Sequence, residues 1–411
     1  MGNSNLVAGL DIGSGRVCCV IAEHGERPDR IRVLGGGAAE CKGLKAGMVL
    51  NIDEAARTIK SAVEEAERKA DRIVTGVLLG VRGPHLQSFE SRGTWRIARM
   101  DQEITPEDVS SVIENSKAVR LSSGMEFLEV VPQRFSLDRL IGVPNPVGME
   151  GSLLEVGTHI IAASGPALTN LAKAVAAAGF RLDGGPVCTL LAVGELTVAA
   201  EEKELGVLLV DMGGHTTSVA IYAEGAVHFS KEFRFGAENI TRDMAYGMGS
   251  GLAAARSLKE RYGAAYTALI DPDKVITYPS INLRFKREIR QAELLRFIQP
   301  RVEEMFALIG AEIQKSPYAG LPGGVVMAGG GALLPGMPDA AAELLELPQA
   351  RLAALVHEGI ECPPEYAGQD YLGAVALAAY PALGSWVHVD GGTALGTPLF
   401  RRLMNWFSDF I

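Results

Sequence analysis

Two aspartates that end apolar runs and precede glycine turns are the residues most able to do chemistry in this chain. Asp211 follows the apolar run 207–210, and after Gly213 and Gly214 the chain resumes as a second apolar run, 219–222. Adjacent glycines let backbone N–H groups approach an anion, and a carboxylate at a strand end suits a Mg²⁺ that keeps most of its waters. Taken alone, this pattern equally fits an ordinary β-hairpin with a glycine turn.

The same pattern occurs near the N-terminus. There an apolar run ends at Asp11, Gly13 and Gly15 form the turn, and a second apolar run follows. A third apolar run, 325–328, leads into three consecutive glycines at 329–331. Together these features resemble those of the actin/Hsp70/sugar-kinase superfamily. This resemblance implies two related lobes that clamp ATP between two phosphate hairpins and an adenosine loop.

Composition limits the class of protein. The chain has 411 residues, enough for two lobes with separate cores, and its 47% hydrophobic and 21% charged residues are typical of a soluble globular protein. A net charge of −10 argues against general nucleic-acid binding. The five cysteines form no CxxC pair, and we expect them to be reduced core residues of a cytosolic protein. We expect no signal peptide and no apolar run long enough to span a bilayer.

Residue patterns predict several elements. Helices are expected at 52–70, after Thr105-Pro106, over 240–262 with a break near 247–251, over 288–314 with a kink at Pro300, and over 369–383. Strands are expected at 31–38, 73–81, 95–98, 127–137 and 153–162. The stretch from 83 to 164 therefore looks like a compact insertion.

That insertion is similar in size and place to one found in the FtsA family of bacterial cell-division proteins. The matching phrases extend along the whole chain; they are 145–151, 154–156, 159–161, 202–206, 236–243, 258–263, 299–304 and 329–336. The resemblance implies an α/β, two-lobed actin-like ATPase fold with a small α+β subdomain inserted in the first lobe, plus a C-terminal amphipathic helix.

Domain boundaries follow from this resemblance. The first lobe is expected at 1–82 and 165–204, the insert at 83–164, and the second lobe at 205–368 with a helical subdomain at about 237–320. The last core helix is expected at 369–383, a flexible linker at 384–396, and a membrane-targeting helix at 397–411.

The resemblance also implies which residues hold the nucleotide. Asp11 and Asp211 would bind a hydrated Mg²⁺, and Lys259 would lie near the adenine, although alone it equally fits a solvated helix residue. The full set of implied ATP contacts is Asp11, Gly13, Ser14, Gly15, Arg16, Asp211, Gly213, Gly214, His215, Thr216, Gly236, Lys259, Gly329, Gly330 and Gly331.

Several positions depart from the family pattern. Gly15 and Arg16 replace the last two residues of the usual Gly-Thr-Ser-Lys turn, His215 and Ser218 replace a glycine and an aspartate, and Arg256 stands where relatives have an acid. Segment 188–191 offers no obvious residue to orient an attacking water. No catalytic residue is assigned, and we expect ATP binding to survive these changes better than hydrolysis.

A basic patch interrupts the acidic chain. Its members are Arg284, Lys286, Arg287, Arg290, Arg296 and Arg301. A solvated helix face with nearby acidic partners would give the same composition, whereas an acidic peptide would also fit such a surface. In FtsA proteins this region binds the C-terminal tail of the tubulin-like protein FtsZ, and the resemblance makes Arg287 and Arg301 the candidates.

The C-terminal stretch is amphipathic. Thr397 caps the segment, Pro398 takes the first helical position, and at about 100° per residue the large apolar side chains lie on one side. The residues expected to enter the membrane are Leu399, Phe400, Leu403, Trp406, Phe407 and Phe410. A terminal helix docked on its own domain would show the same pattern, but a glycine-rich tether and an aromatic face with flanking arginines favour an interfacial helix.

The expected function is therefore that of an actin-like ATP-binding protein on the cytoplasmic side of the inner membrane at the division site. The resemblance implies that it tethers FtsZ filaments, self-assembles into filaments and recruits other divisome proteins. Alternatives are a pilus-assembly ATP-binding protein similar to PilM, or a small-molecule kinase of the same superfamily. A kinase would need a base carboxylate near the γ-phosphate, and no third carboxylate motif is present.

Overall fold

The structure is a computed structural model that describes residues 5–388, except 14, 26, 28–29, 267–268, 283–284, 319 and 384–386. Its strands are β1 Leu6–Ile12, β2 Arg16–His24, β3 Ile31–Glu40, β4 Leu44–Lys45, β5 Met48–Val49, β6 Gly76–Val81, β7 Leu86–Arg96, β8 Met125–Leu137, β9 Leu140–Val143, β10 Leu153–Ser164, β11 Arg181–Leu182, β12 Val187–Cys188, β13 Val207–Met212, β14 Thr217–Ala223, β15 Ala226–Phe233, β16 Val275–Pro279, β17 Lys286–Arg290, β18 Val325–Ala328, β19 Ala350–Leu352, β20 Ile360–Glu361 and β21 Val387–His388. Its helices are α1 Ile52–Ala70, α2 Pro106–Ser116, α3 Gly165–Ala177, α4 Thr189–Thr197, α5 Ala200–Leu205, α6 Ala237–Met248, α7 Leu252–Tyr262, α8 Gln291–Ile313, α9 Met337–Leu344 and α10 Leu372–Leu383, with a 3₁₀ turn, η2, at Gly330–Leu333.

Two sheets of related topology form the two lobes. The first has the strand order β11–β6–β1–β2–β3–β20, and the second has the order β15–β14–β13–β18–β19. In each, an antiparallel hairpin (β1–β2 or β13–β14) pairs in parallel with a later strand, β6 or β18. The sheets therefore repeat one arrangement, as the two hairpin motifs predicted.

Helix α1 follows its sequence signals at both ends. The Asn51 side chain accepts a hydrogen bond from the Glu54 N–H at 3.0 Å, and the left-handed Asp71 ends the helix. Its small apolar face lies unusually close to β3, because a Cβ added at Gly37 would lie 2.1 Å from the Ala62 carbonyl oxygen. Glycine is required there for this close packing.

Strand β13 is buried on both faces. Leu209 packs with the core of the first lobe, whereas Leu208 and Val210 pack with a core built around α6 and α8. A continuous apolar run is what such a strand needs, so the interpretation of 207–210 as a buried strand is confirmed. Because alternate side chains share a face, Asp211 points to the same side as Leu209, toward the first lobe.

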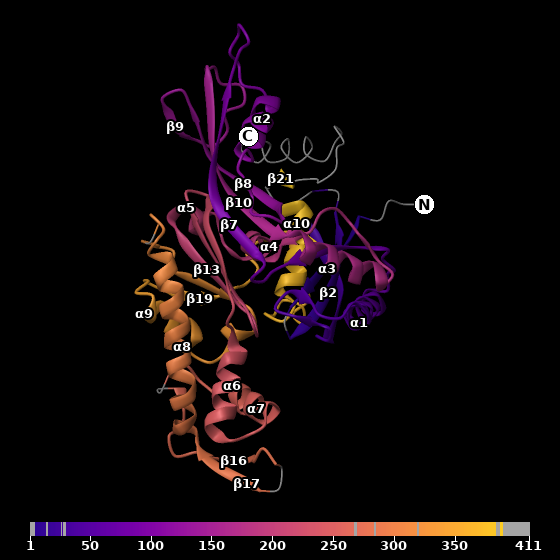
Figure 1. Cartoon of the computed structure of the whole chain (residues 1–411), viewed down its shortest axis with the longest axis vertical. Helices are drawn as coiled ribbons and strands as arrows, with labels where there is room; N and C mark the ends of the chain where they lie inside the picture. Colours follow the sequence, from indigo (N-terminus) through magenta and orange to yellow (C-terminus); the bar gives the residue numbers. More distant parts are fainter. Residues whose placement is uncertain are drawn as a thin grey trace.

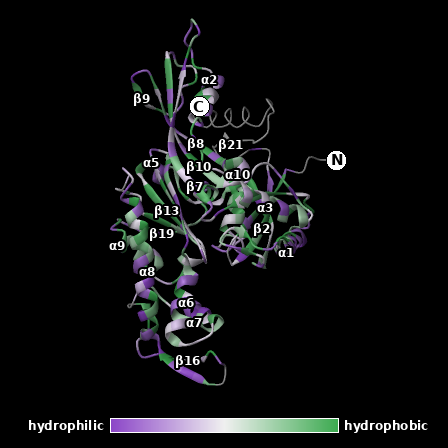
Figure 2. Ribbon diagram, in the orientation of Figure 1, coloured by the Kyte–Doolittle hydropathy of each residue, from purple (hydrophilic) through white to green (hydrophobic). Residues whose placement is uncertain are grey.

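The insert has its own sheet and core. Strands β8, β10 and β7 pair antiparallel in that order, β9 pairs with β8, and α2 covers one face. Figure 1 shows the insert at one end of the long axis and the β16–β17 hairpin at the other. Figure 2 shows largely hydrophobic strands where the lobes and the insert meet, and hydrophilic residues in the β16–β17 hairpin at the far tip, where β17 is mostly charged.

Asp108 organises the start of α2, and its loss is expected to destabilise the insert. Its carboxylate accepts hydrogen bonds from Trp95 Nε1 at 2.9 Å, from the Thr105 N–H and hydroxyl at 2.8 Å each, and from Arg99. Burial acts to raise the pKa of Asp108, but these hydrogen bonds outweigh it and hold the pKa well below its usual range. Asp108→Ala should cost about 2–3 kcal/mol, since several donors then lose their partner.

The pH dependence of this effect has a definite sign. A depressed folded-state pKa stabilises the protein above the unfolded value of about 3.9 and ceases to do so as pH falls through the folded pKa. Thermal unfolding of the wild type and Asp108→Ala should therefore differ most near neutral pH and converge in acid. A difference in melting temperature between the wild type and Asp108→Ala that stays constant down to strongly acidic pH would contradict this role for the Asp108 carboxylate.

Some elements differ from the sequence predictions. The helix expected from residue 288 begins at Gln291, because residues 286–290 form β17 and pair with β16. Pro300 lies inside this helix. Of the short strand expected at 95–98, residues 95–96 form the end of the long strand β7, whose alternation of polar and apolar residues is irregular, and residues 97–98 lie beyond it. The strand expected from residue 73 starts at Gly76, and Ile73 is exposed.

Within the predicted linker, Val387–His388 forms β21 and pairs with β8. The remainder of that linker and the predicted helix at 397–411 lie outside the described residues. In the part of the chain that the structure covers, no helix is long and apolar enough to cross a membrane.

Candidate functional site

A cleft of about 1320 Å³ lies between the lobes and is lined by both glycine turns. The implied nucleotide residues that line it are Asp11, Gly13, Gly15, Arg16, Asp211, Gly213, Gly214, His215, Thr216, Lys259, Gly329, Gly330 and Gly331. Ser14 lies outside the described residues. Residues from three distant parts of the sequence thus meet at one cleft, which is large enough for a nucleoside triphosphate.

The parallel pairing of strands explains this convergence. Asp11 is in register with Gly80 on β6, and Asp211 is in register with Ala328 on β18. Parallel strands end at the same edge of a sheet, and ligands of α/β sheets bind at that edge. The segments that follow β1, β6, β13 and β18 therefore meet at the cleft.

Arg82, which follows β6, joins the two aspartates and was missed by the sequence analysis. Its Nη2 donates to Asp11 Oδ2 at 2.9 Å and its Nη1 to Asp211 Oδ2 at 3.1 Å. Burial acts to lower the pKa of Arg82, but Asp11 and Asp211 more than offset it and raise the pKa. The pKa of Asp11 is raised, chiefly by burial and against the effect of Arg82. A guanidinium thus holds carboxylates of both lobes.

Each aspartate keeps one oxygen without a partner in the part of the chain that the structure describes. Asp11 Oδ1 and Asp211 Oδ1 are buried and form no hydrogen bond within the described residues. Two such acceptors at one site fit the waters around a Mg²⁺, which prefers oxygen ligands and keeps several waters. The donor set therefore fits a hydrated magnesium ion.

Glycines at 329 and 373 leave room for these carboxylates. A Cβ at Gly329, which has a φ of 83°, would lie 2.4 Å from Asp211 Oδ1. A Cβ at Gly373, near the start of α10, would lie 2.3 Å from Asp11 Oδ2. A larger residue at either position would displace a carboxylate, so both glycines shape the site.

The second turn is fixed to the start of α6. The Gly213 and Gly214 carbonyls accept hydrogen bonds from the N–H groups of Ala237 at 3.0 Å and Glu238 at 2.8 Å. A Cβ at Gly236 would lie 2.5 Å from the Gly213 oxygen. The structure therefore places Gly236 behind the turn, where it supports the turn rather than lining the cleft.

Lys259 and Arg256 mark the far side of the cleft. The Lys259 ammonium donates to the Ala237 carbonyl at 3.0 Å and to the Thr241 hydroxyl at 2.9 Å, and burial lowers its pKa. Arg256, predicted to replace an acid of the family pattern, pairs with Glu238 at 2.9 Å. The charge of Arg256 is therefore balanced by an acid at the start of α6.

Segment 188–191 does not contribute to the cleft. Cys188 and Leu190 line a different cavity, and the Thr189 hydroxyl lies near Gly80, where a Cβ would be 2.6 Å away. None of these four residues lines the cleft in the described structure. That segment 188–191 offers no residue to orient an attacking water stays a prediction.

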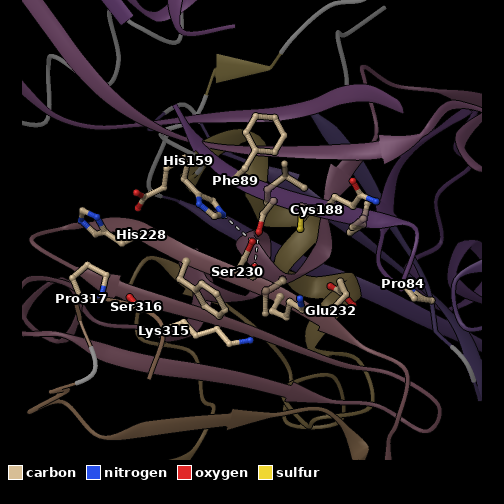
Figure 3. Close-up of a pocket in the computed structure, with 18 residues that line it drawn as sticks. Pro84, Phe89, His159, Cys188, His228, Ser230, Glu232, Lys315, Ser316 and Pro317 are labelled. Atoms are coloured by element: carbon tan, nitrogen blue, oxygen red, sulfur yellow. Dashed lines mark hydrogen bonds between the residues drawn. The ribbon is translucent and has the colours of Figure 1, made fainter. Parts of the chain in front are cut away.

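That second cavity, of about 640 Å³, lies between the insert and the second lobe (Figure 3). His159 on β10 is hydrogen-bonded through Nε2 to the Ser230 hydroxyl at 2.8 Å, and burial and the nearby His228 lower its pKa to about 3. Glu232 lines the same cavity and accepts a hydrogen bond from the Gly83 N–H at 3.2 Å. These contacts tie the base of the insert to β15.

The basic patch is divided between β17 and α8. Arg287 is exposed, and its Nη1 donates to the Met248 carbonyl at 3.1 Å. Arg301 is half-buried and bonds Asp243 through Nε at 2.6 Å and Nη2 at 3.1 Å, and it also pairs with Glu304. Arg284 lies outside the described residues. Arg287 therefore has the more accessible guanidinium.

Comparison with protein families gives two matches. Residues 208–369 match the family model described as cell division protein FtsA, and residues 83–162 match the SHS2 domain inserted in FtsA. A curated relative, the cell division protein FtsA of Neisseria meningitidis, is 34% identical over 341 residues, which cover 82% of this chain and 81% of the relative.

Solved structures show the same architecture at low identity. The PilM–PilN type IV pilus biogenesis complex contains a chain with a TM-score of 0.65 and 16% identity, covering 92% of this chain and 98% of that one. MreB5 of Spiroplasma citri bound to ADP has a TM-score of 0.55 and 13% identity, with 92% and 95% covered. The actin-like fold with an inserted SHS2 subdomain is thus confirmed.

Proposed function

Because this chain belongs to the FtsA family of cell-division proteins, we propose that it binds Mg-ATP in the cleft and anchors FtsZ filaments to the cytoplasmic face of the membrane at the division site. One observation carries the nucleotide part: Asp11 and Asp211 approach the same guanidinium from opposite lobes, beside two glycine turns. Polyphosphate and a hydrated Mg²⁺ are the ligands that suit this combination of backbone donors and carboxylates.

The roles of individual residues follow from their positions. The turns at Gly13, Gly15 and Arg16 and at Gly213–Thr216 would hold the phosphates from either side, and Asp11 and Asp211 would hold the magnesium waters. Lys259 and the turn Gly329–Gly331 would lie beside the base and sugar. A bound nucleotide would then contact both lobes, so its presence would favour one lobe arrangement and the filament contacts that depend on it.

The proposed assembly has three further partners. An acidic FtsZ tail would dock on the basic patch, copies of this chain would form a filament, and residues 397–411 would lie in the membrane interface. Filament formation would strengthen membrane binding, because many weak anchors then act together. Other divisome proteins would bind the assembled filament.

ATP hydrolysis is expected to be slow. No residue of segment 188–191 lines the cleft, and His215 and Ser218 replace residues of the family's second turn. Steady-state phosphate release should lie far below the median enzyme turnover of about 10 per second. Turnover near that median, lost in an Asp11→Ala variant, would show that the cleft is an active ATPase.

The FtsZ part is tested by a peptide from the FtsZ C-terminus. Arg287→Glu with Arg301→Glu should abolish peptide binding in fluorescence anisotropy, since both attractive charges are reversed. Arg301→Glu places a carboxylate beside Asp243, so Arg287→Glu alone, at an exposed site, serves as the milder variant. Unchanged ATP binding shows that the variants are folded.

A control comes from the opposite lobe. Arg57→Glu changes an exposed arginine on α1 and should leave peptide binding intact. Equal peptide affinity in the wild type and the double variant would make the patch an ordinary solvated surface and would remove it from the proposed function.

A further inference from the structure

Arg82 provides a single cation shared by both lobes. Its side chain is 11% exposed, and its two terminal nitrogens are divided between Asp11 and Asp211, whose side chains are 13% and 4% exposed. A guanidinium commonly binds one carboxylate with two nitrogens. Here each carboxylate receives one nitrogen, so the charge lies between the lobes rather than with either of them.

The surroundings hold Arg82 in this position. A Cβ at Gly373 would be 3.0 Å from Nη2, so α10 closes one side, and the adjacent Gly83 N–H is bonded to Glu232 of the second lobe. The aspartates and Glu232 raise the pKa of Arg82, so it carries its charge at every physiological pH. Its Nε is buried and has no partner within the described residues, which leaves a donor for a further acceptor.

The charge balance of the cleft depends on this residue. Without Arg82, two nearly buried carboxylates would face each other beside the position of the phosphates, and both would repel an anion. In such a site a divalent metal must supply the compensating charge before a polyphosphate can bind. With Arg82 present, the protein itself supplies the compensating positive charge. Asp11 Oδ1 and Asp211 Oδ1 remain available to magnesium waters.

We propose that Arg82 takes over the electrostatic role of the metal, so that this chain binds ATP almost as tightly without Mg²⁺ as with it. The inference rests on the proposed ATP site and adds to it a property of this chain's own residues. Mg²⁺ still binds through the free carboxylate oxygens, but it contributes little to the affinity for the nucleotide.

Isothermal calorimetry of the full chain with ATP, in excess Mg²⁺ and in excess EDTA, tests this. The two dissociation constants should differ by less than about tenfold for the wild type and by more than about 100-fold for Arg82→Ala, which has lost a charged partner of both carboxylates. Arg82→Lys keeps the charge but forms fewer directed bonds, and it should lie between them. Arg92→Ala, at an exposed arginine on β7, should match the wild type.

The outcomes separate this inference from the proposed function. ATP binding by Arg82→Ala in Mg²⁺ would show that the variant is folded. Loss of ATP binding by this variant in EDTA then reports the missing charge of Arg82. If the wild type binds ATP only in Mg²⁺, or if both proteins show the same metal dependence, the role of Arg82 is refuted and the nucleotide site stands. If the wild type binds no ATP under either condition, the nucleotide site itself is refuted.

Discussion

Asp211→Ala should weaken ATP binding by about 10- to 100-fold, which is the loss expected when an interaction with a charged group is removed. The carboxylate is almost fully buried at the end of β13, one oxygen binds Arg82, and the other has no partner among the described residues. The substitution removes the contact that holds Arg82 to the second lobe, so the cation beside the proposed phosphate position loses its fixed place and the bridge between the lobes is broken. Calorimetry in Mg²⁺ measures the change.

Asp273→Ala is the matched control for this variant. Asp273 is an exposed aspartate of the same lobe, outside the cleft, so its loss should leave the affinity for ATP unchanged. An Asp211→Ala protein that binds ATP as tightly as the wild type would contradict the assignment of the second hairpin to the nucleotide.

Deletion of residues 398–411 should release the protein from anionic vesicles. Burying each large apolar side chain of the proposed helix contributes about 1.5–3 kcal/mol before ordering costs, whereas each of the two arginines adds only about 1 kcal/mol near anionic lipid. Loss of the segment should therefore abolish binding in a flotation assay, and added salt should weaken the wild type only in part.

Point substitutions separate the apolar face from the charge. Trp406→Glu with Phe407→Glu places two acids on the proposed membrane face and should act like the deletion. Ser408→Glu adds an acid on the opposite face and should retain most of the binding. A truncated protein that still floats with the vesicles would place the anchor elsewhere in the chain.

The hairpins could be predicted because burial on both faces leaves a clear mark in the sequence. Residues 207–210 are apolar throughout since Leu209 and Leu208 contact different cores, and the aspartate and glycines that follow mark the strand end. Helix α1 was also predicted to its ends, because Asp53 at its start and the spaced small apolar residues agree, and the structure adds the Asn51 cap. Local and tertiary preferences coincide in these elements.

Arg82 could not be recognised in the same way. It is a single charged residue before a glycine, and its meaning depends on the pairing of β6 with β1, which no local pattern reveals. The useful signal was the position of β6: a strand parallel to β1 must end near Asp11, so a charged residue directly after it lies at the same edge.

Elements stabilised by distant partners were also the ones predicted least well. Strand β17 is charged except for Ile289 and is held by its pairing with β16. The helical spacing of the residues that follow led to the prediction of a helix there. Strand β7 contains Gly93, whose missing Cβ admits the Val112 carbonyl oxygen of α2 at close range. Such contacts override local propensity.

The central claim, that this chain links FtsZ to a membrane, is tested most directly by flotation of FtsZ with anionic vesicles. FtsZ filaments should move to the vesicle fraction when the full chain and ATP are present, and remain behind when the chain is omitted or lacks residues 398–411. Recovery of equal amounts of FtsZ with the vesicles in the presence and absence of this protein would contradict the account.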